Sequence, residues 1–210
     1  MRVIPFTYDT SDELISNTFV LVDNNNDCVV IDPGCLYQGI NNFIDKNGFT
    51  LKAVLLTHGH FDHIMGLNSF SVKYPDVDIY CFKDETALAK DSNKNGSLMT
   101  GVPYIAECDL KTLVEGVVTL AGREIKVIHT PGHTAGSCMF YLENEKTVFT
   151  GDTLIETSIG RTDLPTGSET EIFKSLEKIK SIPFADDVEF YFGHGSPLNY
   201  SELIKYNQFL

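Results

Sequence analysis

Hydrophobic positions along the chain follow two periods, one typical of strands and the other typical of helices. Short apolar and β-branched runs that are bounded by Gly, Pro, Asn or Asp predict strands. Segments in which apolar residues recur every three or four positions predict helices. The expected strands span residues 3–8, 18–22, 28–31, 51–57, 77–82, 123–128, 137–142, 147–150 and 188–192.

The expected helices lie mostly between these strands, so that strands and helices alternate along the chain. Glycine and proline mark several helix ends, and a capping box of Ser168 and Glu171 opens one helix. The expected helices span residues 36–48, 63–74, 84–90, a segment that begins after Ser168, and a short segment within 197–210. Residues 91–101 are rich in Asn, Ser, Lys and Gly, which predicts a loop.

The composition is that of a globular protein with a packed core. Of the 210 residues, 42% are hydrophobic and 21% are charged, which is ordinary for a folded protein and too apolar for a disordered one. We expect a single domain over residues 1–210. The five cysteines are scattered and form no Cys-x-x-Cys pair, which predicts reduced thiols and no disulfide framework.

The charge balance narrows the range of partners. Sixteen Lys and Arg against 29 Asp and Glu give a net charge of −13, which repels nucleic acids and anionic membranes. The first residues lack the apolar stretch of a signal peptide, and the strongest apolar run, 53–56, is too short to span a bilayer. We therefore expect a cytoplasmic protein that acts on a small molecule and has neither a nucleic acid nor a membrane as its partner.

Histidines gather where the expected strands end. The densest group is residues 58–63, His-Gly-His-Phe-Asp-His, directly after the apolar strand 51–57. Imidazole and carboxylate groups are ligands that Zn²⁺ and similar ions accept. In an extended turn the first two histidines point the same way, whereas Asp62 and His63 lie at the start of the next helix and point to a neighbouring position. The segment therefore predicts two adjacent metal positions.

Three later segments offer further ligands. Each follows an expected strand and has a glycine directly before the candidate ligand, which is His133, Asp152 or His194. Glycine lets the backbone turn sharply and approach a crowded site closely. We therefore expect these three side chains to join those of residues 58–63.

The order His-x-His-x-Asp-His followed by His, Asp and His resembles the metallo-β-lactamase superfamily. Residues 128–137 and 160–165, the latter Gly-Arg-Thr-Asp-Leu-Pro, resemble its glyoxalase II branch, the hydroxyacylglutathione hydrolases. The resemblance extends over residues 10–197. It implies an α/β (α+β) fold, the four-layer αββα metallo-β-lactamase sandwich of two mixed β-sheets with outer helices, and a site at one edge where strand ends converge.

The resemblance also implies which residues hold two divalent metal ions. One ion is bound by His58, His60 and His133, the other by Asp62, His63 and His194, and Asp152 bridges the two. Zinc is the expected metal, with iron or manganese as alternatives. Two such ions activate a shared water for attack on a carbonyl and stabilise the oxyanion that forms. The expected catalytic residues are Asp62, which orients the water, and Asp152, which joins the ions.

Three further residues have expected roles close to the metals. A buried ion pair between Arg161 and Asp163 is expected to hold their loop, with direct substrate contact as the alternative. His129 has no metal-binding counterpart in the family, and we expect it to be structural or to support the ligands from behind.

The resemblance implies hydrolysis of a thioester, such as a hydroxyacylglutathione or a smaller S-acyl thiol. Full-length glyoxalase II enzymes carry a C-terminal helical region that holds glutathione, whereas only residues 195–210 follow His194 here. We therefore expect no such glutathione-binding domain. We also expect a smaller or different thioester, or weak turnover of glutathione thioesters, and a pocket lined by residues 91–104.

The sequence leaves other activities open. Persulfide dioxygenases share these motifs and use one Fe²⁺, which His58, His133 and Asp152 would hold as a facial triad of two histidines and a carboxylate. Lactone opening is a second alternative. The missing signal peptide disfavours an exported enzyme that opens β-lactams, the acidic charge disfavours RNA processing, and the complete set of ligand positions disfavours a degenerate binding protein. The residues do not predict the oligomeric state.

Overall fold

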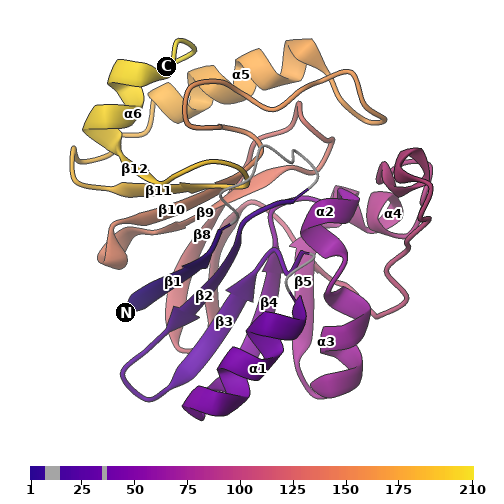
Figure 1. Cartoon of the computed structure of the whole chain (residues 1–210). Helices are drawn as coiled ribbons and strands as arrows, with labels where there is room; N and C mark the ends of the chain where they lie inside the picture. The colour runs from indigo at the N-terminus through magenta and orange to yellow at the C-terminus, as the bar shows by residue number, and fades with distance from the viewer. Residues whose placement is uncertain (8–14, 35–36) are drawn as a thin grey trace.

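Two six-stranded sheets lie face to face, and helices cover their outer sides (Figure 1). The structure is a computed structural model that describes residues 1–7, 15–34 and 37–210. The strand order is β1-β2-β3-β4-β5-β6 in the first sheet and β12-β11-β10-β9-β8-β7 in the second. Each sheet contains parallel and antiparallel pairs, so the predicted sandwich of two mixed sheets is confirmed.

The first sheet is built from the N-terminal half of the chain. Its strands are β1 (Arg2–Phe6), β2 (Thr18–Val22), β3 (Asp27–Ile31), β4 (Thr50–Leu56), β5 (Asp78–Phe82) and β6 (Lys111–Leu113). β1, β2 and β3 pair antiparallel, whereas β3, β4, β5 and β6 pair parallel. Parallel neighbours end at the same edge of a sheet, and residues 57–63 begin at that edge, directly after β4.

The second sheet is built from the C-terminal half. Its strands are β7 (Gly116–Leu120), β8 (Arg123–His129), β9 (Cys138–Leu142), β10 (Thr147–Gly151), β11 (Glu189–Phe192) and β12 (Leu198–Asn199). Only β10 and β11 pair parallel, and the other neighbours are antiparallel. Because β10 and β11 end at one edge, Asp152 and His194 follow them at neighbouring positions.

The helices form the two outer layers, with α1 and α3 on the first sheet and α5 and α6 on the second (Figure 1). Their bounds are α1 (Tyr37–Asn47), α2 (Phe61–Ile64), α3 (Leu67–Lys73), α4 (Thr86–Ala89), α5 (Glu169–Lys180) and α6 (Tyr200–Tyr206). The single helix predicted over 63–74 is wrong, because α2 and α3 are separate. Between them, the backbone N–H of Gly66 donates to the carbonyl of Pro33 at 2.7 Å.

Three hydrophobic clusters fill the spaces between the four layers. The middle cluster lies between the sheets and combines residues of both, such as Ile31 from the first and Phe140 and Phe149 from the second. One outer cluster joins the first sheet to α1 and α3, and the other joins the second sheet to α5 and α6. Successive strand residues point to opposite faces, and Val30 accordingly lies in an outer cluster while Ile31 lies in the middle one.

Several segments differ from the sequence-based expectation or go beyond it. The pattern did not predict β6, β7 or β12, which are short or have exposed residues. The predicted loop 91–101 contains a 3₁₀ turn, Ser97–Thr100. The predicted Ser168 cap is present, since its hydroxyl accepts from the backbone N–H of Glu171 at 3.3 Å.

Two features of the described residues bear on the remaining expectations. Their cysteines, Cys28, Cys81, Cys108 and Cys138, are free thiols. No helix within residues 1–7, 15–34 and 37–210 is long and apolar enough to cross a membrane. The predicted positions Tyr8, Cys35 and Leu36 lie outside the described residues.

Candidate metal centre

The first set of candidate ligands follows β4. The carboxylate of Asp32, directly after β3, accepts from the backbone N–H and the hydroxyl of Thr57 at 2.8 and 2.6 Å. These bonds fix the turn that begins the His-Gly-His-Phe-Asp-His segment. The next residues open α2, so that Asp62 and His63 lie in its first turn and are buried.

The second set comes from the facing sheet, and the two sheets approach each other closely at this edge. The backbone N–H of Cys138 donates to the carbonyl of Thr57 at 2.9 Å, which joins the ends of the two sheets. A Cβ on Gly151, which has a φ of +51°, would lie 2.3 Å from the hydroxyl oxygen of Thr57. A Cβ on Gly193 would lie 2.0 Å from Asp152 Oδ1. The glycines that precede these candidate ligands therefore permit the close approach that the sequence predicted.

All seven candidate ligands come together. In the first group, His133 Nε2 lies 3.2 Å from His58 Nε2 and 2.8 Å from His60 Nδ1. In the second group, Asp62 Oδ2 lies 3.5 Å from His63 Nε2 and 3.3 Å from His194 Nε2. Within each group the potential ligand atoms all lie within 4.8 Å of one another.

Asp152 connects the two groups. Its Oδ2 lies 3.5 Å from the Nε2 atoms of both His133 and His194, and its Oδ1 lies 3.3 Å from His63 Nε2. One carboxylate therefore faces histidines of both groups, as a ligand shared by two ions would.

The polar atoms of this cluster fit a metal better than they fit one another. Two atoms of the cluster, His63 Nε2 and Asp152 Oδ1, are buried and make no well-formed hydrogen bond within the described part of the chain. Buried polar atoms are normally paired, and a cation would satisfy such lone pairs. Histidine and aspartate are ligands for divalent metals, so the residues present suit such ions.

Two contacts orient histidine rings from behind. His63 Nδ1 donates to Asp32 Oδ2 at 3.0 Å, and His133 Nδ1 donates to the carbonyl of Arg161 at 2.8 Å. Each bond places the proton on Nδ1 and leaves the Nε2 lone pair for a metal. The sequence analysis missed Asp32, whose only signal was that it ended a strand in Asp-Pro-Gly.

Burial and neighbouring charges shift the pKa values of the candidate ligands, in a direction that differs between the two groups. Burial lowers the pKa of His58, and it lowers that of His60 to about 3, with nearby histidines adding to the effect. Both rings are therefore neutral near pH 7, as metal ligands must be. Burial alone would raise the pKa of Asp152, but the imidazoles of His63 and His194 hold it well below its usual range.

Nearby carboxylates raise the pKa values of the two histidines in the second group, His63 and His194. Burial opposes the charge on His194, yet Asp152 and Asp62 raise its pKa to about 10. His63 likewise has a raised pKa, because three carboxylates surround it and outweigh its burial. Near pH 7 these two imidazoles hold protons, which a divalent cation would displace on binding because histidine ligands must be neutral.

Arg161 and Asp163 form the predicted ion pair, but its predicted burial is wrong. Arg161 Nε and Nη2 donate to the two carboxylate oxygens at 2.7 and 2.8 Å, and the side chains are 59% and 67% exposed. The Arg161 carbonyl accepts from His133 Nδ1, whereas the charged groups of the pair lie mostly in solvent. His129 stacks on Phe82 at 4.1 Å and its Nε2 bonds the carbonyl of Ala135, which is a structural arrangement apart from the metal cluster.

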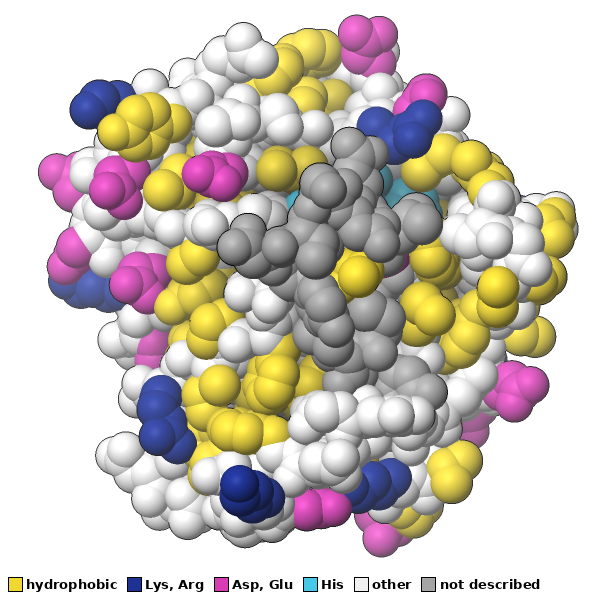
Figure 2. Space-filling model, in the orientation of Figure 1, with side chains coloured by type: hydrophobic (Ala, Val, Ile, Leu, Met, Phe, Trp, Pro, Cys, Tyr) yellow, Lys and Arg dark blue, Asp and Glu magenta, His cyan; other side chains and the backbone are white. Residues whose placement is uncertain are grey.

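The segment 91–104 begins beside the cluster. The carbonyl of the buried Asn95 accepts from the backbone N–H of Phe61 at 3.0 Å, between His60 and Asp62. Leu98, Met99 and Val102 farther along the segment are exposed. Figure 2 shows histidine side chains reaching the surface of one face, with hydrophobic side chains around them. That residues 91–104 line a substrate pocket stays a prediction.

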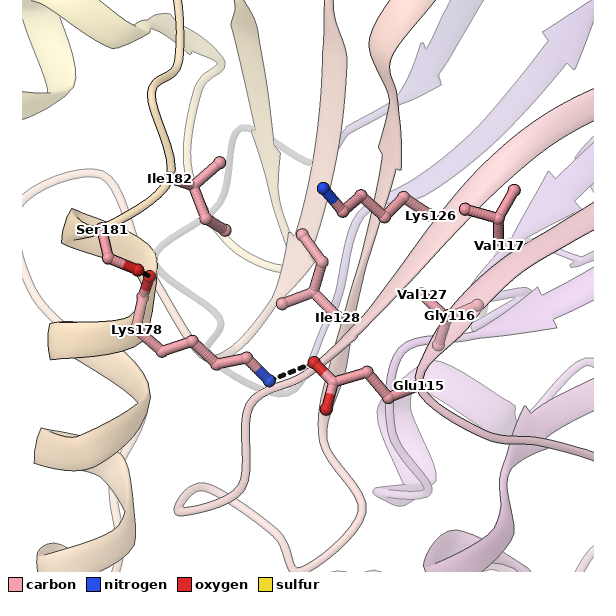
Figure 3. A pocket seen from close by; sticks show the side chains of 9 residues that line it. All are labelled: Glu115, Gly116, Val117, Lys126, Val127, Ile128, Lys178, Ser181 and Ile182. Carbon is pink, nitrogen blue, oxygen red and sulfur yellow. Dashed lines mark hydrogen bonds and ion pairs between the residues drawn. The ribbon is translucent and has the colours of Figure 1, made fainter.

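A separate hollow of about 280 Å³ lies between β7, β8 and the C-terminal end of α5 (Figure 3). Its lining is mainly apolar, and Lys178 at its rim pairs with Glu115. None of the candidate metal ligands lines it.

Comparisons with known proteins agree with this geometry. The family model of the Metallo-beta-lactamase superfamily matches residues 11–194. The chain is 33% identical to the probable metallo-hydrolase YqgX of Bacillus subtilis (strain 168) over 171 residues, 80% of each chain. It is 30% identical to the hydroxyacylglutathione hydrolase GloC of Haemophilus influenzae over 197 residues, 92% of each chain.

A solved structure extends the agreement to three dimensions. The crystal structure of the BLEG-1 B3 metallo-beta-lactamase superposes with a TM-score of 0.91 at 29% identity, covering 100% of this chain and 99% of that one. The match of the family model, the identity to relatives of similar length, and the histidine and aspartate cluster lead to one conclusion. The chain belongs to the metallo-beta-lactamase superfamily.

Proposed function

We propose that the chain is a glyoxalase II-like hydrolase that binds two divalent metal ions and cleaves a thioester. The observation that carries the proposal is the shared position of Asp152. Its carboxylate faces His133 of the first group and both histidines of the second group at 3.3 to 3.5 Å. A site for a single ion would not need two complete groups of ligands joined by one carboxylate.

Two divalent ions bound by these residues would lower the pKa of water to near neutrality and polarise a carbonyl. The chain's own residues prepare the site for them. Asp32 and the Arg161 carbonyl hold the rings of His63 and His133 with Nε2 turned inward. We propose that Asp62, whose side chain is 10% exposed, accepts a hydrogen bond from the attacking water and orients it.

The charge state of the carboxylates favours a thioester over a substrate with a poorer leaving group. The neighbouring imidazoles lower the pKa of both Asp62 and Asp152, so neither is a proton donor near neutral pH. A thiol has a pKa of about 8.5 and leaves as a thiolate with little acid catalysis. The ionised site therefore suits an S-acyl substrate.

The thiol that carries the acyl group is the second part of the substrate. The relative named hydroxyacylglutathione hydrolase GloC matches this chain over 92% of both lengths, which supports a glutathione thioester. The C-terminal tyrosine Tyr200 is partly buried and packs against Phe184 and Phe190. The net charge of the chain is −13, which disfavours anionic glutathione derivatives. We therefore propose that smaller thioesters are cleaved better than glutathione thioesters.

A thiol-release assay tests this function. The zinc-loaded protein is assayed with S-lactoylglutathione and with S-acetyl-N-acetylcysteamine, a small neutral thioester, and the released thiol is titrated with Ellman's reagent. We expect hydrolysis of the small thioester, slower hydrolysis of S-lactoylglutathione, and loss of both in Asp152→Ala. If the protein cleaves neither thioester with two metals bound, the thioester assignment is contradicted.

A persulfide dioxygenase is the second candidate, because its three expected ligands also lie together. His133 Nε2 is 3.2 Å from His58 Nε2 and 3.5 Å from Asp152 Oδ2. A single iron at these three residues would leave the second group, Asp62, His63 and His194, without a role. One iron per chain, together with oxygen uptake in the presence of a persulfide, would favour it over the hydrolase.

A further inference from the structure

Glu85 is a buried carboxylate that the mechanism above does not use. It ends the 3₁₀ turn Lys83–Glu85 after β5, and its exposure is 0%. Its Oε2 accepts from the backbone N–H of Gly59 at 2.6 Å. Its Oε1 accepts from the backbone N–H of Gly136 and from the hydroxyl of Thr134, both at 2.7 Å.

These donors belong to two separate segments that carry the first group of ligands. Gly59 lies between His58 and His60, after β4 of the first sheet, and Thr134 directly follows His133, after β8 of the second sheet. Each of the three histidines is thus the neighbour of a residue bonded to Glu85. The same carboxylate spans the gap between the sheets.

The glycines around Glu85 make room for it. A Cβ on Gly59 would lie 3.1 Å from Oε2, and a Cβ on Gly136 would lie 2.8 Å from Oε1 and from Cγ of Glu85. Burial disfavours a charged carboxylate and raises the pKa of Glu85, whereas its three donors favour the charged form. An apolar side chain would leave two backbone N–H groups unpaired, so the carboxylate has a structural purpose at this position.

We propose that Glu85 is a positioning residue that fixes the two histidines after β4 relative to His133 and so sets the metal affinity of the first position. The inference rests on the proposed function in that it requires the seven-residue site to bind metal. The second position, formed by Asp62, His63 and His194, has no bond to Glu85 and is held by Asp32 instead. Glu85 therefore acts on one position selectively.

The variant Glu85→Gln tests this selectivity. Its amide has a single oxygen, so its NH₂ group must face either the Gly59 N–H or the Gly136 N–H. Zinc affinities are measured on metal-free protein by competition with a chromophoric chelator. We expect one of the two zinc affinities, that of the first position, to fall about 10- to 100-fold below its wild-type value, the typical effect of changing a group that orients ligands. The other zinc affinity should stay within twofold of its wild-type value.

Ile44→Ala is the matched control. Ile44 is buried in the cluster between the first sheet and α1, so its truncation lowers the unfolding temperature without touching the site. We expect both zinc affinities of the control to be unchanged. Selective weakening in Glu85→Gln but not in the control supports the proposal, whereas unchanged affinities or equal loss at both positions would overturn it.

A second variant decides the matter if Glu85→Gln does not fold. Thr134→Val removes one of the three donors and keeps the shape of the side chain, so we expect a smaller loss at the same position, and unchanged zinc binding would overturn the proposal. A wild-type chain that binds no metal contradicts the proposed function as well. A wild type with two metals and an unaltered Glu85→Gln contradicts this inference alone.

Discussion

Gly193 lies where a single methyl group would enter the metal cluster. A Cβ at this position would be 2.0 Å from Asp152 Oδ1 and 2.7 Å from His63 Cε1. Ordinary contact distances are about 3.5 Å, so in Gly193→Ala the carboxylate of Asp152 has to move by roughly 1.5 Å. Metal sites tolerate deviations of only about 0.2 Å in ligand distance, and the displaced carboxylate can no longer bridge the two groups.

We expect Gly193→Ala to fold and to lose most of its bound metal. A misplacement of about 1 Å can reduce activity by about 100-fold, so the hydrolysis rate should fall at least that far. Gly39→Ala is the matched control, because a Cβ at this helical position meets no atom within 4 Å. That control should keep its metal and gain about 0.5–1 kcal/mol of stability from the improved helix propensity.

The assay compares the three proteins side by side. Wild type, Gly193→Ala and Gly39→Ala are purified without chelators, their metal content is measured by elemental mass spectrometry, and circular dichroism reports their folding. A folded Gly193→Ala protein with the metal content and activity of the wild type would refute the geometry described for Asp152.

Three further predictions follow from the same contacts. Asp152→Ala should lose most of its metal and activity, as measured by elemental mass spectrometry and thiol release, because it removes the carboxylate shared by both groups. Asp32→Asn should weaken zinc binding by about 10- to 100-fold in a chelator competition, because it disturbs the acceptor that orients His63. Asp163→Asn should leave the thermal unfolding temperature unchanged, since its ion pair is exposed and such pairs contribute little.

The sequence predicted the sandwich well where strands are buried and regular. β9 is buried throughout and β4 is buried over its last four residues, and the predicted strands match the observed ones to within one residue. β12 has only two residues and β7 is largely exposed, so neither carries the hydrophobic signal on which such predictions depend. The break between α2 and α3 coincides with a bond from Gly66 to Pro33, a tertiary contact that periodicity does not encode.

The candidate ligands were predictable because their chemistry is dense and each follows a strand end. The residues that orient them were not, because a single acidic residue has no distinguishing pattern. Asp32 and Glu85 are identified only when the fold brings them against Thr57 and Gly59. The exposure of the Arg161–Asp163 pair likewise depends on which side of the loop faces solvent, which neighbouring residue types do not determine.

The most direct test of the account is the metal content per chain of protein purified without chelators or added metal. Elemental mass spectrometry of the wild type should give close to two divalent ions per chain, with zinc as the expected metal, because two groups of ligands share Asp152. One iron per chain with little zinc would contradict the dinuclear hydrolase and favour the dioxygenase. No bound metal would contradict the function proposed for this site altogether.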